Sequence, residues 1–133
     1  MSDSQPTPAE ANVARLHELL QLRRLDSDAG PRESDLFVGP SQYKPDGRVF
    51  GGQVLAQCIV AAAATLPPDR LIHSLHGYFL RAGDVAEPIE FGVERLRDGR
   101  SFSARRVHAY QKDAPILSLI ASFQEEQAGF EHS

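Results

Sequence analysis

One run of residues in this chain predicts a helix without a polar face. It reads GQVLAQCIVAAAATL, residues 52–66, and only Gln53, Gln57 and Thr65 in it are polar. A helix that is apolar nearly all the way round must be buried nearly all the way round. Its alanines let other backbone approach closely, and the two prolines that follow end it because proline cannot continue a helix. The sequence therefore predicts a long central helix that the rest of the chain wraps.

The second half of the chain is the candidate wrapper. It consists of apolar and β-branched runs separated by turn residues, a pattern that predicts strands. The expected strands are 70–82, 88–96, 101–111 and 115–124. Lys112, Asp113 and Ala114 predict a tight turn between the last two strands, which makes the sheet an antiparallel meander with short connections.

The turn signal Asp98-Gly99 predicts how the second and third of these strands pair. A hairpin closed there pairs Leu96 with Ser101, Glu94 with Ser103 and Val93 with Ala104. In that register the core face carries Ile89, Phe91, Val93, Phe102 and Ala104. The opposite, largely wet face then carries Glu90, Glu94, Ser101, Ser103 and Arg105.

The residues before the glycines add one more helix and a short strand. Residues 1–6 are polar and predict a disordered tail, and TPAE after them is a helix start with Thr7 as the N-cap. An apolar stripe down to Leu22 predicts an amphipathic helix, and residues 36–39 predict a strand. We expect one domain over 7–133, of the α+β class. Its architecture is the hot-dog fold, an antiparallel sheet wrapped around a long buried central helix, with the N-terminal amphipathic helix added.

Composition narrows the class of partner. The chain has 133 residues, a net charge of -4 and a pI near 5.7, so nothing overall attracts nucleic acid or an anionic membrane. Its one cysteine, Cys58, forms no disulfide within the chain and suits a reducing compartment. The first ten residues lack the features of a signal peptide, and the longest apolar run is too short for a bilayer. These features predict a soluble cytoplasmic protein that neither binds nucleic acid nor inserts into membranes.

Gly51 and Gly52 stand at the start of the predicted helix. The N–H groups of a first helical turn can hold a phosphate or polarise a carbonyl oxygen. The pattern is not a P-loop, because it lacks G-x-x-x-x-G-K-[ST]. The glycines are either ligand-facing amides or a point where the helix end passes closely beneath a strand, and the sequence allows both.

The histidines raise the questions of a metal site and of a general base. His73 and His76 differ by an odd number, so on a strand they point to opposite faces and cannot chelate one ion together. Zinc needs three or four converging ligands, and we expect neither a metal nor a cofactor. His73 is a candidate general base, with a structural or interface histidine as the alternative.

Arginines make the predicted sheet locally basic, although the whole chain is acidic. They are Arg81, Arg95, Arg97, Arg100, Arg105 and Arg106. Such a patch can hold the phosphates of a nucleotide-bearing ligand, for which Arg81 and Arg105 are the candidates. The alternative is a solvated sheet face paired with Glu90 and Glu94. No serine lies in a G-x-S-x-G motif, so a serine hydrolase is not expected.

Several motifs together resemble a known family. FGGQ, HSLHGYFLRAGD, RDGRSFSARRV and ASFQ, all within residues 34–132, resemble the first half of the type II acyl-CoA thioesterases, the TesB-like family. The resemblance implies a hot-dog fold and hydrolysis of fatty acyl-CoA to free fatty acid and CoA, with the acyl chain held along the apolar helix and strands. Members of this family usually carry two hot-dog domains. The second domain supplies a catalytic Asp, a Ser or Thr, and a Gln.

The resemblance also implies that the catalytic half lies outside this sequence. Residues 47–68 contain no Asp or Glu, and a glutamine can orient a water but cannot take its proton. By position in the duplicated fold, Gln53 stands near the place of the second domain's aspartate, and Gln124 near the place of its glutamine. If the chain is active by itself, His73 is the candidate base and the Gly51 and Gly52 amides polarise the carbonyl.

Two functions remain as hypotheses. The chain is an acyl-CoA thioesterase or the N-terminal half of one. Alternatively, it is a catalytically silent acyl-binding or assembly module that needs a second hot-dog domain or a partner chain. Apolar surface on an isolated half predicts a homodimer, a higher homo-oligomer or pairing with that second domain. Hydration of enoyl-CoA is not favoured, because it needs a paired Asp and His at the start of the central helix.

Overall fold

The structure, a computed structural model, describes residues 7, 10, 17–25, 35–40 and 51–125. Its labelled elements are β1 (Arg23–Leu25), β2 (Asp35–Gly39), α2 (Gly51–Ala63), β3 (Arg70–Phe79), β4 (Ile89–Asp98), β5 (Phe102–Gln111) and β6 (Ala114–Glu125). All five strands expected from the sequence are present, and β1 is a strand that the sequence did not predict.

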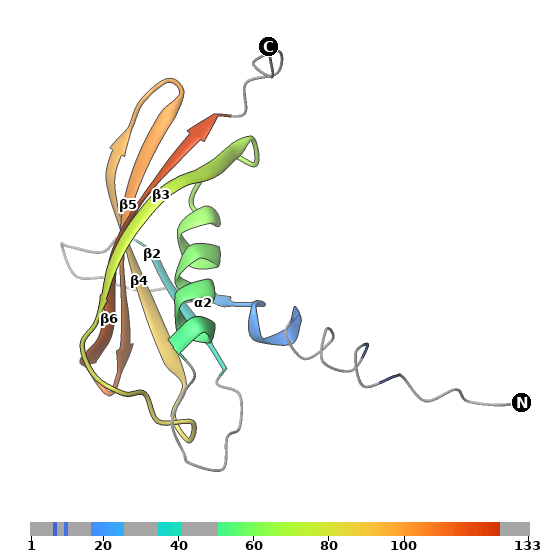
Figure 1. Cartoon of the computed structure of the whole chain (residues 1–133), viewed down its shortest axis with the longest axis vertical. Coiled ribbons are helices and arrows are strands. Elements are labelled where there is room, and N and C mark those ends of the chain that lie inside the picture. The colour runs from blue at the N-terminus through green and yellow to red at the C-terminus, as the bar shows by residue number, and fades with distance from the viewer. Residues whose placement is uncertain (1–6, 8–9, 11–16, 26–34, 41–50, 126–133) are drawn as a thin grey trace, which may run out of the picture.

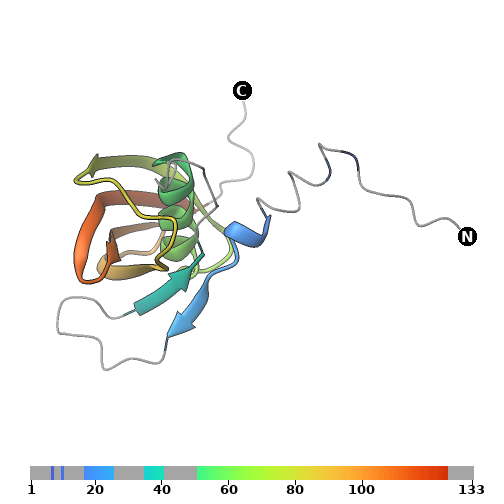
Figure 2. The same ribbon diagram turned by 90° about the horizontal axis from the view of Figure 1, so that it is seen from below.

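The six strands form one antiparallel sheet in the order β1-β2-β4-β5-β6-β3. As expected of a meander, β4, β5 and β6 follow one another as hairpins, but β3 lies beside β6 and β2 lies beside β4. The sheet curves around one side of α2, and no other described helix lies on it (Figures 1 and 2). The expected α+β architecture, an antiparallel sheet around a helix, is confirmed at this level.

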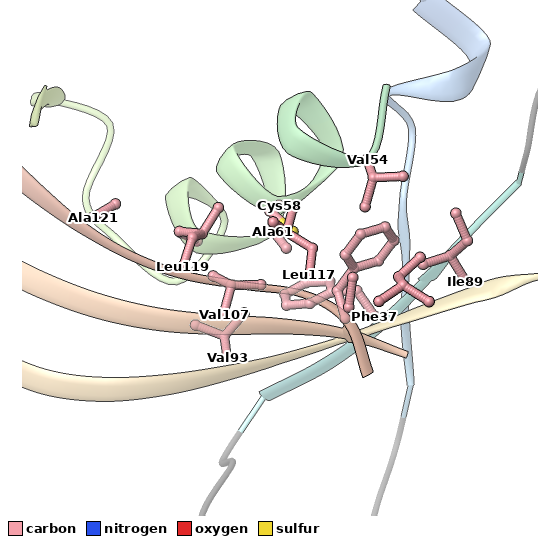
Figure 3. Close-up of a cluster of buried hydrophobic side chains, with 14 of the residues drawn as sticks. Phe37, Val54, Cys58, Ala61, Ile89, Val93, Val107, Leu117, Leu119 and Ala121 are labelled. Carbon is pink, nitrogen blue, oxygen red and sulfur yellow. The ribbon is translucent and has the colours of Figure 1, made fainter. Parts of the chain in front are cut away.

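Helix α2 packs against the concave side of the sheet. Val54, Cys58 and Ala61 point from the helix toward sheet residues such as Val107 and Leu117 (Figure 3). The other side of the helix is partly open, since Gly52 and Ala63 are exposed and Ile59 is half-buried. Burial on every side is therefore not met within the described residues, because this chain's sheet covers α2 from one side only.

The N-terminal helix expected over 7–22 falls mostly outside the described residues, as does the tail at 1–6. Residues 17–19 are helical. The Thr7 N–H donates to the Glu10 carboxylate at 2.8 Å, and the Glu10 N–H donates to the Thr7 hydroxyl at 3.0 Å. This reciprocal pair is a capping box, and it agrees with the prediction of Thr7 as the N-cap.

The β4–β5 hairpin does not have the expected register. Glu94 pairs with Arg106 instead of Ser103, a shift of three residues. The shift has two sources: a bulge between Arg95 and Arg97 in β4, and a turn wider than two residues at the tip of the hairpin. The register predicted from the sequence was wrong.

A shift by an odd number of residues reverses which face of a strand points to the core. Ser103 and Arg105 on β5 are therefore buried on the helix side. Phe102, expected in the core, is 40% exposed and lies on the outer face of the sheet with Ala104. The next turn is as expected: Lys112 and Asp113 have φ of 50° and 65°, the left-handed values of a two-residue hairpin loop.

Strand β3 is one edge of the sheet, and its side chains are exposed. The large apolar ones are Leu71, Ile72, Leu75, Tyr78 and Phe79. The main sheet contacts of α2 are with β4, β5 and β6, so the helix-side face of β3 lacks that cover. An open edge with apolar side chains is a surface on which another strand can pair.

Candidate functional site

A pocket of about 250 Å³ lies where α2 begins and β3 ends. Gly51 and Val54 of α2 line it together with Phe79 of β3, Arg81 in the segment that follows, and Ile116 of β6. The structure thus brings together two of the residues singled out from the sequence, Gly51 and Arg81. Gly52 lies next to them in the first turn and is exposed.

Gly51 lets the helix end lie against an aromatic ring. A Cβ at this position would lie 3.1 and 3.2 Å from two ring atoms of Phe79, closer than nearly all real contacts. The glycine therefore permits this close packing. The N–H groups of the same turn have no partners within the helix. The glycines can therefore serve both as a point of close packing and as amides that face a ligand.

The pocket is suited to bind a carbonyl oxygen or an anion. The first turn of α2 supplies partial positive charge, and Arg81 adds a full one. Val54, Phe79 and Ile116 give it an apolar wall. No Asp, Glu or His lines the pocket within the part of the chain that the structure describes. The pocket can polarise a carbonyl group, but its described wall has no group that takes a proton from water.

Gln53 is engaged in a buried amide network. Its Nε2 donates to the carbonyl oxygen of Pro40 at 3.1 Å and to the Gln57 side-chain oxygen at 3.1 Å. The Gln57 amide in turn donates to the carbonyl oxygens of Leu19 at 2.8 Å and Pro40 at 2.9 Å. Both glutamines are buried, at 5% and 0% exposure. We assign them a structural role, fastening the N-terminal segment and the end of β2 to the central helix.

Arg105, a substrate-binding candidate from the sequence, is 1% exposed. Its N–H groups donate to the Thr65 hydroxyl at 2.7 Å, to the carbonyl oxygens of Ala104 at 3.0 Å, Thr65 at 3.2 Å and Arg97 at 3.3 Å, and to the Asp98 carboxylate at 2.9 Å. These five bonds match the five N–H groups of a guanidinium. Because β5 turns the opposite face from the expected one toward the core, this side chain points inward. We therefore assign Arg105 a structural role, binding the chain at the end of α2, and not a role in binding a ligand.

Asp98 shows the electrostatic effect of that arrangement. Partial burial disfavours its charged form, but hydrogen bonds from Arg105 and Ser103 outweigh this desolvation. The pKa of Asp98 therefore lies below its ordinary value. The ion pair joins β4 to β5, and Arg105 connects this hairpin to Thr65, just after the end of α2.

His73 and Gln124 lie away from the pocket. His73 occupies a bulge of β3, six residues before Phe79, which is about 20 Å along a strand. Gln124 pairs with Phe102 and shares its outer face of the sheet. The structure therefore does not bring His73 or Gln124 together with Gly51.

Other chemically notable groups do not form a site in the described residues. Cys58 is fully buried, and desolvation raises the pKa of its thiol, which makes it an unreactive small apolar residue. Among the described residues, no three His, Cys, Asp or Glu side chains gather where they could hold a metal ion. None of the described helices is long and apolar enough to cross a membrane.

Phe79 and Ile116 are pocket residues that the sequence analysis did not single out. They come together because β3 lies beside β6, where the Leu80 N–H donates to the Ile116 carbonyl oxygen at 2.9 Å. The available signal was the alternation of apolar residues in the two strands. That signal does not give the order of strands in the sheet.

Comparison with known proteins matches this chain to one family. The family described as acyl-CoA thioesterase N-terminal domain matches residues 40–124. Human acyl-coenzyme A thioesterase 8 is 48% identical over 97 residues, which are 73% of this chain and 30% of that protein. Acyl-CoA thioesterase 2 of Haemophilus influenzae is 45% identical over 117 residues, which are 88% of this chain and 38% of that protein.

Solved structures give the same result. The acyl-CoA thioesterase II TesB2 of Mycobacterium marinum superposes with a TM-score of 0.72 at 42% identity, over 90% of this chain and 41% of that chain. This likeness confirms the hot-dog thioesterase fold and the TesB-like resemblance expected from the sequence. The chain spans 30% and 38% of the two curated relatives, so most of each relative lies outside the match.

Proposed function

The chain belongs to the acyl-CoA thioesterase N-terminal domain family, and on that premise we propose that it is the N-terminal half of an acyl-CoA thioester hydrolase. The observation that carries the proposal is the pocket at the mouth of α2. It offers helix N–H groups, the cation of Arg81 and an apolar wall, but no acidic or histidine side chain among its described lining residues. Such a pocket binds the substrate and leaves the base to another unit.

The steps of the reaction are therefore shared between this chain and a second unit. Water attacks the thioester carbonyl carbon, the C–S bond breaks, and CoA leaves as a thiolate that takes up a proton. The N–H groups of Gly51 and Gly52 stabilise the negative charge that develops on the carbonyl oxygen. The apolar wall holds the start of the acyl chain. A carboxylate of a second hot-dog unit accepts the proton of the attacking water.

The edge of β3 is the surface through which we expect that unit to dock. By the register with β6, Ile72, Leu75 and Phe79 lie on the core side of the sheet, yet they are 41%, 41% and 59% exposed. A strand paired to β3 would continue the ladder and cover them. Phe79 belongs to both this edge and the pocket wall. A unit docked on β3 is therefore adjacent to the bound carbonyl.

The second candidate function is a silent acyl-binding or assembly module. One observation favours it. Gln53 and Arg105, which the sequence suggested as site residues, are instead engaged in hydrogen bonds within the described fold. In the assembly form of this alternative, the pocket holds no carbonyl during the reaction, and the chain contributes only its β3 edge. The two functions differ in whether Arg81 affects substrate binding by the complete assembly.

The test combines this chain with the remainder of the Haemophilus influenzae relative. We expect release of free CoA from acyl-CoA by the mixture, with a KM that Arg81→Ala raises severalfold. Leu75→Lys should prevent activation because it places a charge in the paired edge. Leu96→Lys is the matched control, since Leu96 is 38% exposed but lies on β4. Activation without any effect of Arg81→Ala would favour the silent module.

A further inference from the structure

A second surface, separate from the β3 edge, carries charges of opposite sign at its two ends, and these charges have no partner among the described residues. This surface is the outer face of β2, β4, β5 and β6, the side of the sheet away from α2 (Figure 1). We propose that it is an interface between two copies of this chain. The copies pack sheet against sheet, related by a two-fold axis that runs across the strands.

The centre of the outer face carries small and apolar side chains around one ion pair among the described residues. On β6 the outward side chains there are Ser118, Ile120 and Ser122, and Ala104 of β5 lies opposite Ser122. Ile120 is 41% exposed among these small neighbours. The solvent face of an antiparallel sheet is usually covered by polar and charged side chains. That ion pair joins Arg106 to Glu94, at 3.3 Å.

The two ends of the outer face differ in charge. Arg97 and Arg100 lie at the end formed by the β4–β5 hairpin. Glu90 and Asp113 lie at the other end, around a hollow of about 280 Å³. None of these four side chains has a hydrogen-bond or ion-pair partner within the described ranges. Each copy therefore presents one basic end and one acidic end whose charges are not paired with other described residues.

Only one of the two simple symmetries pairs these ends. A two-fold axis along the strands would place like ends together, which costs free energy. An axis across the strands reverses their direction, so the basic end of each copy lies over the acidic end of the other. Such an interface is isologous, and each contact occurs twice. The charge pattern thus selects the axis.

The same axis gives an apolar side chain a place to bind. On β5, Phe102 lies four residues before Arg106 and Tyr110 lies four residues after it. With the axis near Arg106, Phe102 of one copy faces Tyr110 of the other. Tyr110 lines the hollow at the acidic end, along with Leu36. The exposed Phe102 ring therefore fills the hollow of the second copy.

The expected dimer is weak. Strand β5 spans about 26 Å from Phe102 to Tyr110, and four strands span about 19 Å. The contact is then about 500 Å² on each copy, or about 1,000 Å² in total, which is near the lower limit for a specific interface. Because charged ends steer and hold the contact, we expect association in the micromolar range that weakens as salt is added.

The experiment measures the mass of the full chain by sedimentation velocity over a range of concentrations. It uses the Leu75→Lys background, in which the β3 edge is blocked. We expect a dimer there, which Ile120→Lys abolishes and Ile120→Val retains. Glu90→Arg should weaken the dimer at least tenfold, because it adds a like charge to the end that lies over Arg97 and Arg100 of the second copy. Arg97→Glu added to Glu90→Arg should restore it.

Several results would overturn the proposal. One is a Leu75→Lys chain that stays monomeric at every concentration. Another is a dimer that Ile120→Lys and Glu90→Arg leave unchanged. The double variant with both charges reversed distinguishes loss of the interface from misfolding. A chain that fails to fold would not regain the dimer when a second charge is reversed. A folded double variant that remains monomeric contradicts the pairing of the two ends.

Discussion

The buried side-chain amide of Gln57 donates to the backbone carbonyl oxygen of Leu19 at 2.8 Å, across 38 positions of sequence. The same amide donates to the Pro40 carbonyl oxygen at 2.9 Å. One side chain of the central helix therefore holds the segment before β1 and the end of β2. A polar residue inside an apolar helix is explained by the backbone acceptors it satisfies, because a buried carbonyl without a donor is costly.

Removing that amide should destabilise the fold. In Gln57→Leu the carbonyl oxygens of Leu19 and Pro40 lose this buried donor, and we expect a loss of about 1–3 kcal/mol of unfolding free energy. Urea unfolding monitored by circular dichroism measures it. Gln21→Leu is the matched control, because Gln21 is exposed, and it should change stability by less than about 0.5 kcal/mol. Equal stability of the two variants would contradict the role of Gln57.

We predict that Arg105 has a structural role and that Arg81 binds the ligand. Arg105→Met leaves the Thr65 carbonyl oxygen and Asp98 without their buried cation, and we expect about 3 kcal/mol of lost stability. Arg81→Ala removes an exposed side chain and should leave stability nearly unchanged. In the complex with a second hot-dog unit, Arg81→Ala should instead raise KM. The reverse assignment of the two effects would refute this division.

Gly51→Ala should disturb the pocket more than Gly52→Ala. The new methyl group at position 51 meets the Phe79 ring at 3.1 Å, so the ring must move and the pocket wall with it. We expect a severalfold loss in kcat/KM of the assembled enzyme. Gly52 is exposed, and an alanine there should stabilise the helix by up to about 1 kcal/mol. Identical kinetics of the two variants would show that Phe79 does not shape the site.

Asp98 should make stability depend on pH in the acid range. Its pKa is lower in the folded chain than in the unfolded chain, so its carboxylate stabilises the fold at pH values above the unfolded pKa. That contribution is lost as the pH falls below about 4 and through the folded value. Asp98→Asn should therefore be less stable than the parent at pH 7, and the difference should shrink toward pH 2. A difference that is constant with pH would contradict the ion pair with Arg105.

The elements of the fold could be predicted from the sequence because their signals are local. The run of apolar residues in α2, the alternation in β3 to β6 and the turn at Lys112 and Asp113 each depend on residues that lie close together in the chain. The absence of Asp and Glu from residues 47–68 could be read from the sequence for the same reason. Each of these features needs only the identity of neighbouring residues.

The register of β4 against β5 could not be predicted in this way. The bulge after Arg95 adds one residue to a strand without a sequence signal, and a slip by an odd number reverses every side chain on β5. Arg105 was therefore predicted on the wet face, and Phe102 in the core. Strand order was equally hidden, since nothing local indicates that β3 lies beside β6. The pocket residue Ile116 was missed on that account.

The most direct measurement of the proposed function is free CoA release from acyl-CoA by the purified chain and its His73→Ala variant. Each is assayed alone and with the remainder of a two-domain relative. We expect no release above the rate in buffer from either chain alone, and equal release from both after the remainder is added. Release by the chain alone that His73→Ala abolishes would contradict the claim that the base comes from a second unit.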